Sequence, residues 1–227
     1  MVFGVMGAMP EEIEQLCARM TGVTRETYGG VEYHRGQLGD KTVVACCAGM
    51  GKANAAAATQ VLITRYGADH IVFSGIAGNM TDKVTIGDVV IGRTVVYHDA
   101  ELSMLCQSPP YLKEYSGDPQ MIAAAEAACA AAGVHCLAGR IATGDRFIGD
   151  SAAKRAIAAA CAPDCVEMEG AAVSQIAAKN GVPCVILRAM SDDADEAGRK
   201  KLVGTTFSIA GYVAAATQIV AGMLARL

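Results

Sequence analysis

Aromatic side chains and proline are scarce in this sequence. Its 227 residues include no Trp, 4 Phe, 7 Tyr and 6 Pro. So few rings argue against the stacking platforms that bind single-stranded nucleic acid, and a net charge of −4 argues against general nucleic-acid binding. Charged residues make up only 19% of the chain and hydrophobic residues 52%, a composition that excludes disorder and predicts a large buried core.

Cysteine is abundant, but the close pairs that mark a metal or disulfide site are missing. The nine cysteines are an odd number, and no two of them form a C-x-x-C motif. We therefore predict reduced, buried, structural thiols, no metal site and no cofactor. The cysteines are Cys17, Cys46, Cys47, Cys106, Cys129, Cys136, Cys161, Cys165 and Cys184.

Neither end of the chain has a typical membrane or export signal. The apolar run Val2–Met9 is short, has no basic residues before it and leads into Pro10, unlike a signal peptide. Residues 208–225 carry no charge, but their apolar side chains recur at helical spacing, which predicts a packed C-terminal helix. That stripe is Ile209, Val213, Ala216, Val220, Met223 and Leu227. We expect a cytoplasmic protein without a membrane or nucleic-acid partner.

Short apolar runs alternate with helical patterns along the chain. This alternation predicts an α/β sheet covered by helices on both faces, and the lack of a linker or repeat predicts one domain over residues 1–227. Ligands of such sheets bind beyond the carboxyl ends of the strands. The predicted strands are residues 2–6, 31–38, 42–47, 71–74, 88–96, 137–142, 164–168 and 183–189. The predicted helices begin at Pro10 and span 52–66, 119–132, 151–160, 169–179 and the C-terminal segment, with loops at 75–78, 99–118, 143–150 and 190–198.

A glycine turn, Gly49-Met50-Gly51-Lys52, lies between a predicted strand and a predicted helix. It lacks the first glycine and the final Ser or Thr of a Walker A loop, and Asn54 breaks the dinucleotide-binding glycine pattern. The turn is either an ordinary tight turn or a place where the backbone approaches a group at a helix N-terminus.

Several carboxylates fall where predicted strands end and helices begin. Glu167 and Glu169 are two positions apart, so on an extended chain both face the same side. Asp192 follows a buried strand, and Glu12 opens a helix. Each has a simpler interpretation as a helix-start charge. Together, however, acid and base carboxylates flanking a sugar are what glycosidic cleavage requires, and the loop residue Phe147 is either a core anchor or a ring that stacks on a base.

A series of short motifs gives the chain a family resemblance. The motifs are residues 4–9 with Glu12, and residues 49–52, 74–78, 87–88, 97–100, 144–148, 166–169 and 188–192. In order and spacing they resemble the bacterial 5′-methylthioadenosine/S-adenosylhomocysteine nucleosidases of the nucleoside phosphorylase superfamily, over nearly the whole chain. The resemblance implies a three-layer α/β/α sandwich with a central mixed sheet. It also implies a homodimer and a hydrolase that cleaves the N-glycosidic bond of a 5′-substituted adenosine.

The resemblance also implies catalytic roles. Asp192, oriented by Ser191, donates a proton to N7 of the purine, so that adenine leaves as a neutral molecule. Glu12 activates a water molecule for attack on the anomeric carbon, with Arg188 nearby. Glu169 holds the ribose through its hydroxyls.

Further positions are implied for substrate binding. Met168 contacts the ribose, Phe147 stacks on adenine, and the backbone of Ile148 reads its edge. The other expected substrate-binding residues are Met9 and Met50 around the 5′-thio group, Ala77 and Gly78 beside the nucleoside, and Glu167. Leu102, Leu105 and Pro109 are expected to close the pocket of a neighbouring subunit.

Three places depart from the family pattern and leave substrate preference open. Ile76 replaces a common Ser or Thr, Asn79 replaces a common Gly, and residues 199–207 match the usual lid poorly, with Phe207 displaced along the chain. Two other functions stay open. A purine nucleoside phosphorylase of the same fold needs arginines and hydroxyls for phosphate, and Ile76 disfavours it. A non-catalytic nucleoside-binding protein does not need both Asp192 and Glu12.

Overall fold

The computed structural model describes residues 1–203 and 210–227 of the chain. Its strands are β1 (Val2–Gly7), β2 (Thr21–Tyr28), β3 (Val31–Leu38), β4 (Lys41–Cys47), β5 (His70–Asn79), β6 (Val89–Tyr97), β7 (Tyr115–Ser116), β8 (Cys136–Thr143), β9 (Cys165–Glu167) and β10 (Cys184–Asp192). Its helices are α1 (Glu11–Cys17), α2 (Lys52–Thr64), α3 (Leu102–Leu105), α4 (Pro119–Ala132), α5 (Ser151–Cys161), α6 (Gly170–Asn180), α7 (Glu196–Val203) and α8 (Ala210–Leu224).

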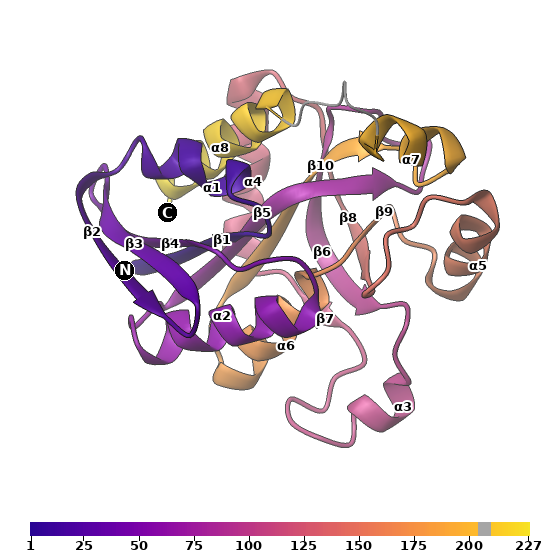
Figure 1. Cartoon of the computed structure of the whole chain (residues 1–227), viewed down its shortest axis with the longest axis horizontal. Helices are drawn as coiled ribbons and strands as arrows, with labels where there is room; N and C mark the ends of the chain where they lie inside the picture. The colour runs from indigo at the N-terminus through magenta and orange to yellow at the C-terminus, as the bar shows by residue number, and fades with distance from the viewer. Residues whose placement is uncertain (204–209) are drawn as a thin grey trace.

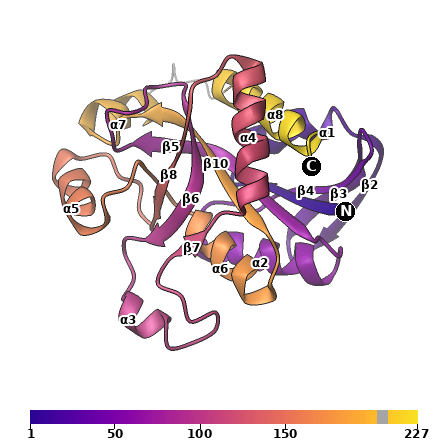
Figure 2. The ribbon, with the colours of Figure 1, turned by 180° about the vertical axis from the view of Figure 1, so that it is seen from behind.

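Helices cover both faces of a mixed sheet. On one face, Leu62 of α2 and Val173 of α6 share an apolar cluster with strand residues. On the other face, Ile13 of α1, Met121 of α4 and Val220 of α8 form a second cluster with the opposite side chains of the strands. Figures 1 and 2 show the sheet between these two helix layers. The predicted α/β/α architecture is confirmed.

Pairing between β5 and β10 closes part of the sheet. The strand order is β10-β6-β8-β9-β5-β1-β4-β3-β2, and β10 also pairs with β5. The strands β5, β10, β6, β8 and β9 therefore form a ring, from which β1, β4, β3 and β2 continue as an open sheet. Because β5 and β10 run parallel, their carboxyl ends emerge together, with Ala189 opposite Ile76 and Asp192 opposite Gly78. The register shifts between Met190 and Asp192, which marks a bulge next to these ends.

The main corrections to the predicted elements fall on these two strands. The predicted loop at 75–78 is wrong, because β5 continues to Asn79. The predicted loop at 190–198 is also wrong, because β10 runs to Asp192 and α7 begins at Glu196. The strand β2, which is mostly exposed at the edge of the sheet, has no counterpart among the predicted strands.

The C-terminal helix α8 packs in the core as predicted, with Val213, Val220 and Met223 buried. Ile209, part of the predicted stripe, lies outside the described residues. Within residues 1–203 and 210–227, no helix combines the length and apolar character needed to cross a bilayer. All nine cysteines are free, but only four are buried and five are partly exposed. The prediction of buried thiols is therefore wrong for those five.

Candidate active site

A pocket of about 270 Å³ opens at the carboxyl ends of β5 and β10. All the residues predicted for catalysis and for substrate binding within one chain line it, namely Met9, Glu12, Met50, Ala77, Gly78, Phe147, Ile148, Glu167, Met168, Glu169, Arg188, Ser191 and Asp192. Three further residues line the pocket without a role predicted from the sequence, namely Ala8, Arg146 and Val166. Arg146 lies inside the 144–148 motif, and its place in that motif is the sequence signal that could have identified it as a pocket residue.

Glu12 is buried at the start of α1, with both carboxylate oxygens directed at backbone N–H groups. Oε2 accepts from Ala8 at 2.6 Å and from Met9 at 3.0 Å, and Oε1 accepts from Ile76 of β5 at 3.2 Å. Burial raises the pKa of Glu12, while Arg188 and these N–H groups act in the opposite direction. Glu12 is therefore a fixed carboxylate that accepts a proton more readily than an exposed glutamate does.

The guanidinium of Arg188 is fully enclosed and contacts two carboxylates. Its Nη2 donates to Glu167 Oε2 and, at 3.2 Å, to Glu169 Oε2. Its Cζ lies over the ring of Phe73, 4.6 Å from the centroid. Because Glu167 and Glu169 share one nitrogen, their predicted placement on the same side of the chain is confirmed.

Glu167 has little acceptor capacity left for a ligand. Its oxygens also accept from the hydroxyl of Thr143, from the N–H of Glu169 at 3.1 Å and from the N–H of Gly170 at 2.7 and 3.0 Å. It thus satisfies N–H groups at the start of α6 and holds Arg188 in place. All of these contacts are within the protein, and its role in substrate binding stays a prediction.

The glycine turn before α2 approaches a carboxylate of the chain itself. The N–H of Gly51 donates to Glu169 Oε1 at 2.8 Å. Gly51 has a φ of 93°, a conformation that glycine adopts without strain. Burial raises the pKa of Glu169 to about 7, against the opposing attraction of Arg188. Glu169 is thus held between α2 and β10, in a place where its charge changes near neutral pH.

Asp192 ends β10 at the bulge, and its two oxygens have different partners. Oδ1 accepts from the N–H of Ala194 at 2.8 Å. Oδ2 lies 2.8 Å from Ser191 Oγ, which is also 3.2 Å from the backbone oxygen of Ala77. A hydroxyl has one hydrogen, so Ser191 donates to one of these two oxygens at a time. When Asp192 is protonated on Oδ2, it donates to Ser191, and Ser191 donates to Ala77. When it is ionised, Ser191 donates to Asp192.

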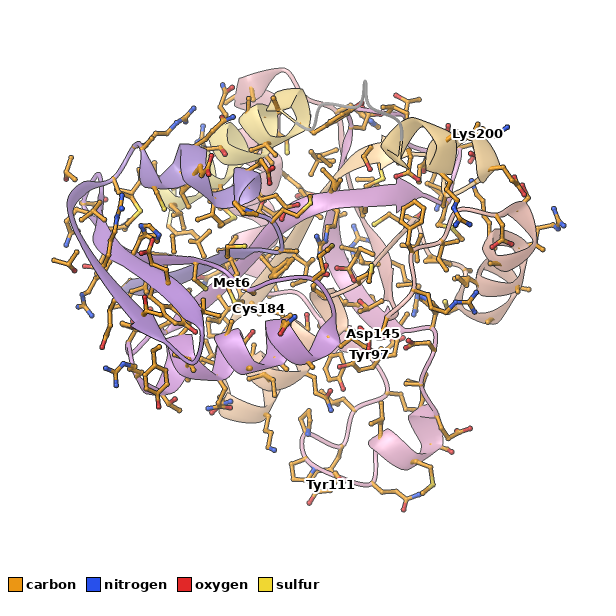
Figure 3. All side chains as sticks on the ribbon, viewed as in Figure 1. Met6, Tyr97, Tyr111, Asp145, Cys184 and Lys200 are labelled. Atoms are coloured by element: carbon orange, nitrogen blue, oxygen red, sulfur yellow. The ribbon has the colours of Figure 1, made fainter. Side chains whose placement is uncertain are left out.

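Large apolar side chains are exposed at the mouth of the pocket. Met50 is 63% exposed and Phe147 is 48% exposed, although both line it. The predicted partner residues do not reach the pocket of their own chain. Leu102 and Leu105 pack against the core from a projecting arm, residues 100–114, in which Pro109 is exposed. Figure 3 shows Tyr111 at the far end of this arm.

The three departures from the family pattern have different outcomes. Ile76 lines the pocket, and its N–H holds Glu12. Asn79 is buried away from the pocket, where its amide donates to the backbone oxygen of Val84 at 3.0 Å. Residues 204–207 of the predicted lid, Phe207 among them, lie outside the described residues. Among the residues that the structure describes, no group of three or more His, Cys, Asp or Glu side chains is arranged to hold a metal ion.

Comparison with known proteins agrees with this geometry. Residues 2–225 match the family model of the phosphorylase superfamily. A 5′-methylthioadenosine/S-adenosylhomocysteine nucleosidase of Shewanella halifaxensis is 36% identical over 209 residues, which cover 86% of this chain and 87% of that protein.

Solved structures give the same result. A nucleosidase of the same name from Neisseria meningitidis, in complex with methylthio-immucillin-A, superposes with a TM-score of 0.92 at 32% identity, covering 100% of this chain and 99% of that one. The futalosine hydrolase of Helicobacter pylori superposes with a TM-score of 0.90 at 27% identity, covering 100% and 98%. The chain therefore belongs to the phosphorylase superfamily and, within it, to the 5′-methylthioadenosine/S-adenosylhomocysteine nucleosidase family.

Proposed function

We propose that this chain hydrolyses the N-glycosidic bond of 5′-methylthioadenosine, S-adenosylhomocysteine or both, and releases adenine. The observation that carries the proposal is one pocket lined by the carboxyls of Asp192, Glu12 and Glu169 and the guanidinium of Arg188. Proton donation to the leaving group and activation of water are the two tasks that such a hydrolysis requires.

Asp192 is the proposed general acid. The oxygen available for the acidic proton is Oδ2, because Oδ1 accepts the N–H of Ala194 while Oδ2 faces the hydroxyl of Ser191. Transfer of that proton to N7 of adenine lets the electron pair of the breaking C1′–N9 bond remain on a neutral purine. Ser191 then donates its hydrogen bond to the ionised Asp192 instead of to Ala77.

Glu12 is the proposed general base. Its Oε1 and Arg188 Nη1 both face Gly75 of β5, and among the described residues no direct ion pair joins them. A water molecule bound between them has its oxygen fixed by the guanidinium and its proton directed at the carboxylate. The water oxygen adds to C1′ of the sugar as Glu12 takes the proton.

The other lining residues are proposed to bind the nucleoside. Glu169 accepts the ribose hydroxyls beside Met168, and Phe147 stacks on adenine, whose edge the backbone of Ile148 contacts. Ala77 and Gly78 let the backbone approach the nucleoside. Met9 and Met50 surround the apolar 5′ group.

Water is a better nucleophile here than phosphate. Arg146 and Arg188 are the cationic side chains among the described residues that line the pocket. Arg188 already bonds Glu167 and Glu169 and faces Glu12, so a phosphate dianion at this position meets three carboxylates. This arrangement favours hydrolysis over phosphorolysis.

Product analysis tests the proposal. The pure protein is incubated with methylthioadenosine, with and without phosphate, and the products are separated by chromatography. Adenine and free methylthioribose in both conditions are expected. A ribose 1-phosphate ester that forms only with phosphate identifies a phosphorylase. If none of methylthioadenosine, S-adenosylhomocysteine and a futalosine-type nucleoside yields adenine, the chain is a nucleoside-binding protein without this activity.

We propose that residues 1–227 act as one domain and that two copies form a homodimer in the cytoplasm. The exposed Met50 and Phe147 at the pocket mouth, with Met104 and Tyr111 on the arm, are the kind of apolar surface that a partner covers. In the dimer, Leu102, Leu105 and Pro109 of one copy close the pocket of the other. Free thiols are usual in a reducing compartment.

Replacing Gly75 by Ala is expected to abolish most activity. A Cβ at this position overlaps Arg188 Nη1 and lies 2.7 Å from Glu12 Oε1, so both side chains must shift to admit it. Overpacking of this kind costs about 1–3 kcal/mol of stability, and we expect kcat/KM to fall about 100-fold as Glu12 and Arg188 move apart. Gly211→Ala is the control, because a Cβ there meets no described atom within 4 Å. Steady-state kinetics that rank the two variants equally contradict this view.

The activity is expected to depend on the ionisation of Glu169. Only its ionised form accepts two hydrogen bonds from ribose, and burial raises its pKa to about 7. The ionised fraction therefore grows as pH rises, so kcat/KM is expected to increase about tenfold per pH unit as pH rises toward 7. In Glu169→Gln, the part of the pH dependence that comes from Glu169 is expected to disappear, and kcat/KM is expected to fall about 10- to 100-fold. Glu114→Gln, a change to an exposed ion-paired glutamate, is expected to keep the profile of the parent.

A further inference from the structure

The N-terminus of α2 bonds two carboxylates from different parts of the chain. Gly51 N–H donates to Glu169 Oε1 at 2.8 Å, and Lys52 N–H donates to Asp145 Oδ1, also at 2.8 Å. The N–H groups at the start of a helix have no partner within the helix and carry a partial positive charge. Here they join a carboxylate of the pocket, Glu169, to the loop at residues 144–150.

The Lys52 side chain extends this connection. Its Nζ lies 2.8 Å from both oxygens of Asp99 and 3.4 Å from Asp145 Oδ2. Asp145 N–H donates to Asp99 Oδ2 at 2.8 Å. The ammonium also lies 5.5 Å from the ring centroid of Tyr97. Lys52, Asp99 and Asp145 thus form one network, which we call the lysine network.

Both main charges of this network persist at neutral pH. Burial acts to lower the pKa of Lys52, but the two aspartates outweigh it and the pKa is raised. Burial acts to raise the pKa of Asp99, but Lys52 and the N–H of Asp145 outweigh it and the pKa is lowered. His98 faces the same region, and burial lowers its pKa, so it adds no positive charge above neutral pH.

The lysine network fixes the start of the 144–150 loop. Gly144 packs directly against the ring of His98 and the carboxyl of Asp99, with no room for a Cβ. At the other end, Asp150 accepts from Ala153 N–H at 2.7 Å and caps α5. Phe147 lies between these two fixed ends. Its ring is half exposed, so core packing alone does not determine its position.

We propose that Lys52 is a positioning residue, which fixes the loop bearing Phe147 over the pocket through Asp99 and Asp145 and thereby sets the affinity for the purine base. The base as ligand rests on the function proposed above. A partly exposed ion pair contributes little to global stability, so the expected effect lies in loop order and base binding.

The first test measures the loop without any ligand. The chain contains no Trp, so Phe147→Trp gives a single fluorescent reporter. In that background Lys52→Met is expected to raise acrylamide quenching of the indole about twofold and to lower its anisotropy, as a loosened loop does. Lys83→Met is the matched control, because Lys83 also bridges to an aspartate, Asp164 at 3.0 Å, but lies outside the pocket. Equal quenching in the Lys52 variant and its parent overturns the proposal, whatever the chain catalyses.

The second test uses the otherwise unchanged protein. Lys52→Met is expected to raise the Kd of adenine, measured by calorimetry, and the KM for methylthioadenosine about tenfold, with kcat within about threefold. Asp99→Asn is expected to act similarly, and the double variant is expected to lose no more than either single variant, as in a shared network. A fall in kcat at unchanged KM and Kd, or an equal loss in Lys83→Met, contradicts a positioning role. If the unchanged protein binds adenine but does not turn over methylthioadenosine, the proposed reaction is refuted, and the positioning role of Lys52 is still tested by the Kd of adenine.

Discussion

Replacing Asp192 by Asn is expected to lower kcat about 10²- to 10⁴-fold, the usual contribution of a general acid. The substitution preserves the local hydrogen bonds. The amide oxygen replaces Oδ1 as acceptor for Ala194 N–H, and the amide N–H donates to Ser191, whose hydroxyl then donates to Ala77. The amide also donates a hydrogen bond to N7 of adenine, but it has no proton to transfer. Adenine is therefore expected to bind within about threefold of the parent affinity while turnover is lost.

Two measurements separate this outcome from its alternatives. Single-turnover release of adenine gives the chemical step, and calorimetry with adenine gives the binding. The matched control is Asp193→Asn, the neighbouring aspartate, which is exposed and does not line the pocket. Unchanged turnover in Asp192→Asn refutes its role as the acid. If adenine binding falls as much as turnover does, Asp192 serves to recognise the base instead.

Glu12→Gln is expected to be almost as damaging, with kcat lower by about 10²- to 10⁴-fold, because an amide accepts no proton from water. This variant also disturbs the fold locally. The carboxylate accepts three backbone N–H groups with its two oxygens, so the NH₂ of a glutamine faces at least one of them. Such a mismatch leaves buried donors unsatisfied and costs about 1–3 kcal/mol of stability.

The readout must therefore distinguish lost chemistry from lost structure. Thermal unfolding measures the stability, and adenine calorimetry reports whether the pocket survives. Glu11→Gln, a change to the exposed neighbour on α1, is expected to keep both activity and stability. If Glu12→Gln keeps its turnover, the residue is a structural cap of the α1 entry. If adenine binding and turnover fall together, the variant has lost the pocket, and Glu12→Asp then decides whether a displaced carboxylate restores the rate.

The sequence predicted elements well where one physical signal dominates. The buried strands and the helices of both layers follow from continuous apolar runs and helical periodicity. The sequence predicts a loop at Gly75–Gly78 because glycine usually marks the end of a strand. In β5, its glycines instead provide the space that the buried Arg188 and Asp192 side chains occupy. That requirement comes from a strand more than a hundred positions away, so no local pattern contains it.

The same limit explains the missed strand and the ring. The strand β2 has one partly buried residue among its eight and therefore no alternating pattern. Its extended conformation comes from pairing with β3. Closure of the ring depends on β10 pairing with both β5 and β6, a matter of register and twist that composition does not encode.

Within the site, residue types were easier to predict than their partners. Glu12, Glu169 and Asp192 stood out as acids at strand ends, and the structure gathers them in one pocket. The partners of Glu167, which come from β8, α6 and β10, were not visible. The sequence also did not show which group the glycine turn approaches. That group is Glu169 of the chain itself.

The pairing of β5 with β10 also fixes when the site comes into existence. Ile76 and Arg188 are separated by 112 positions, and Gly51 and Glu169 by 118. On the ribosome, β5 is made long before β10, so the edge that will hold Arg188 stays unpaired while most of the remaining chain is synthesised. Unpaired strand edges in nascent chains favour aggregation and chaperone binding. Docking of β10 therefore removes this unpaired edge and brings the arginine and the acid into the pocket in the same late step.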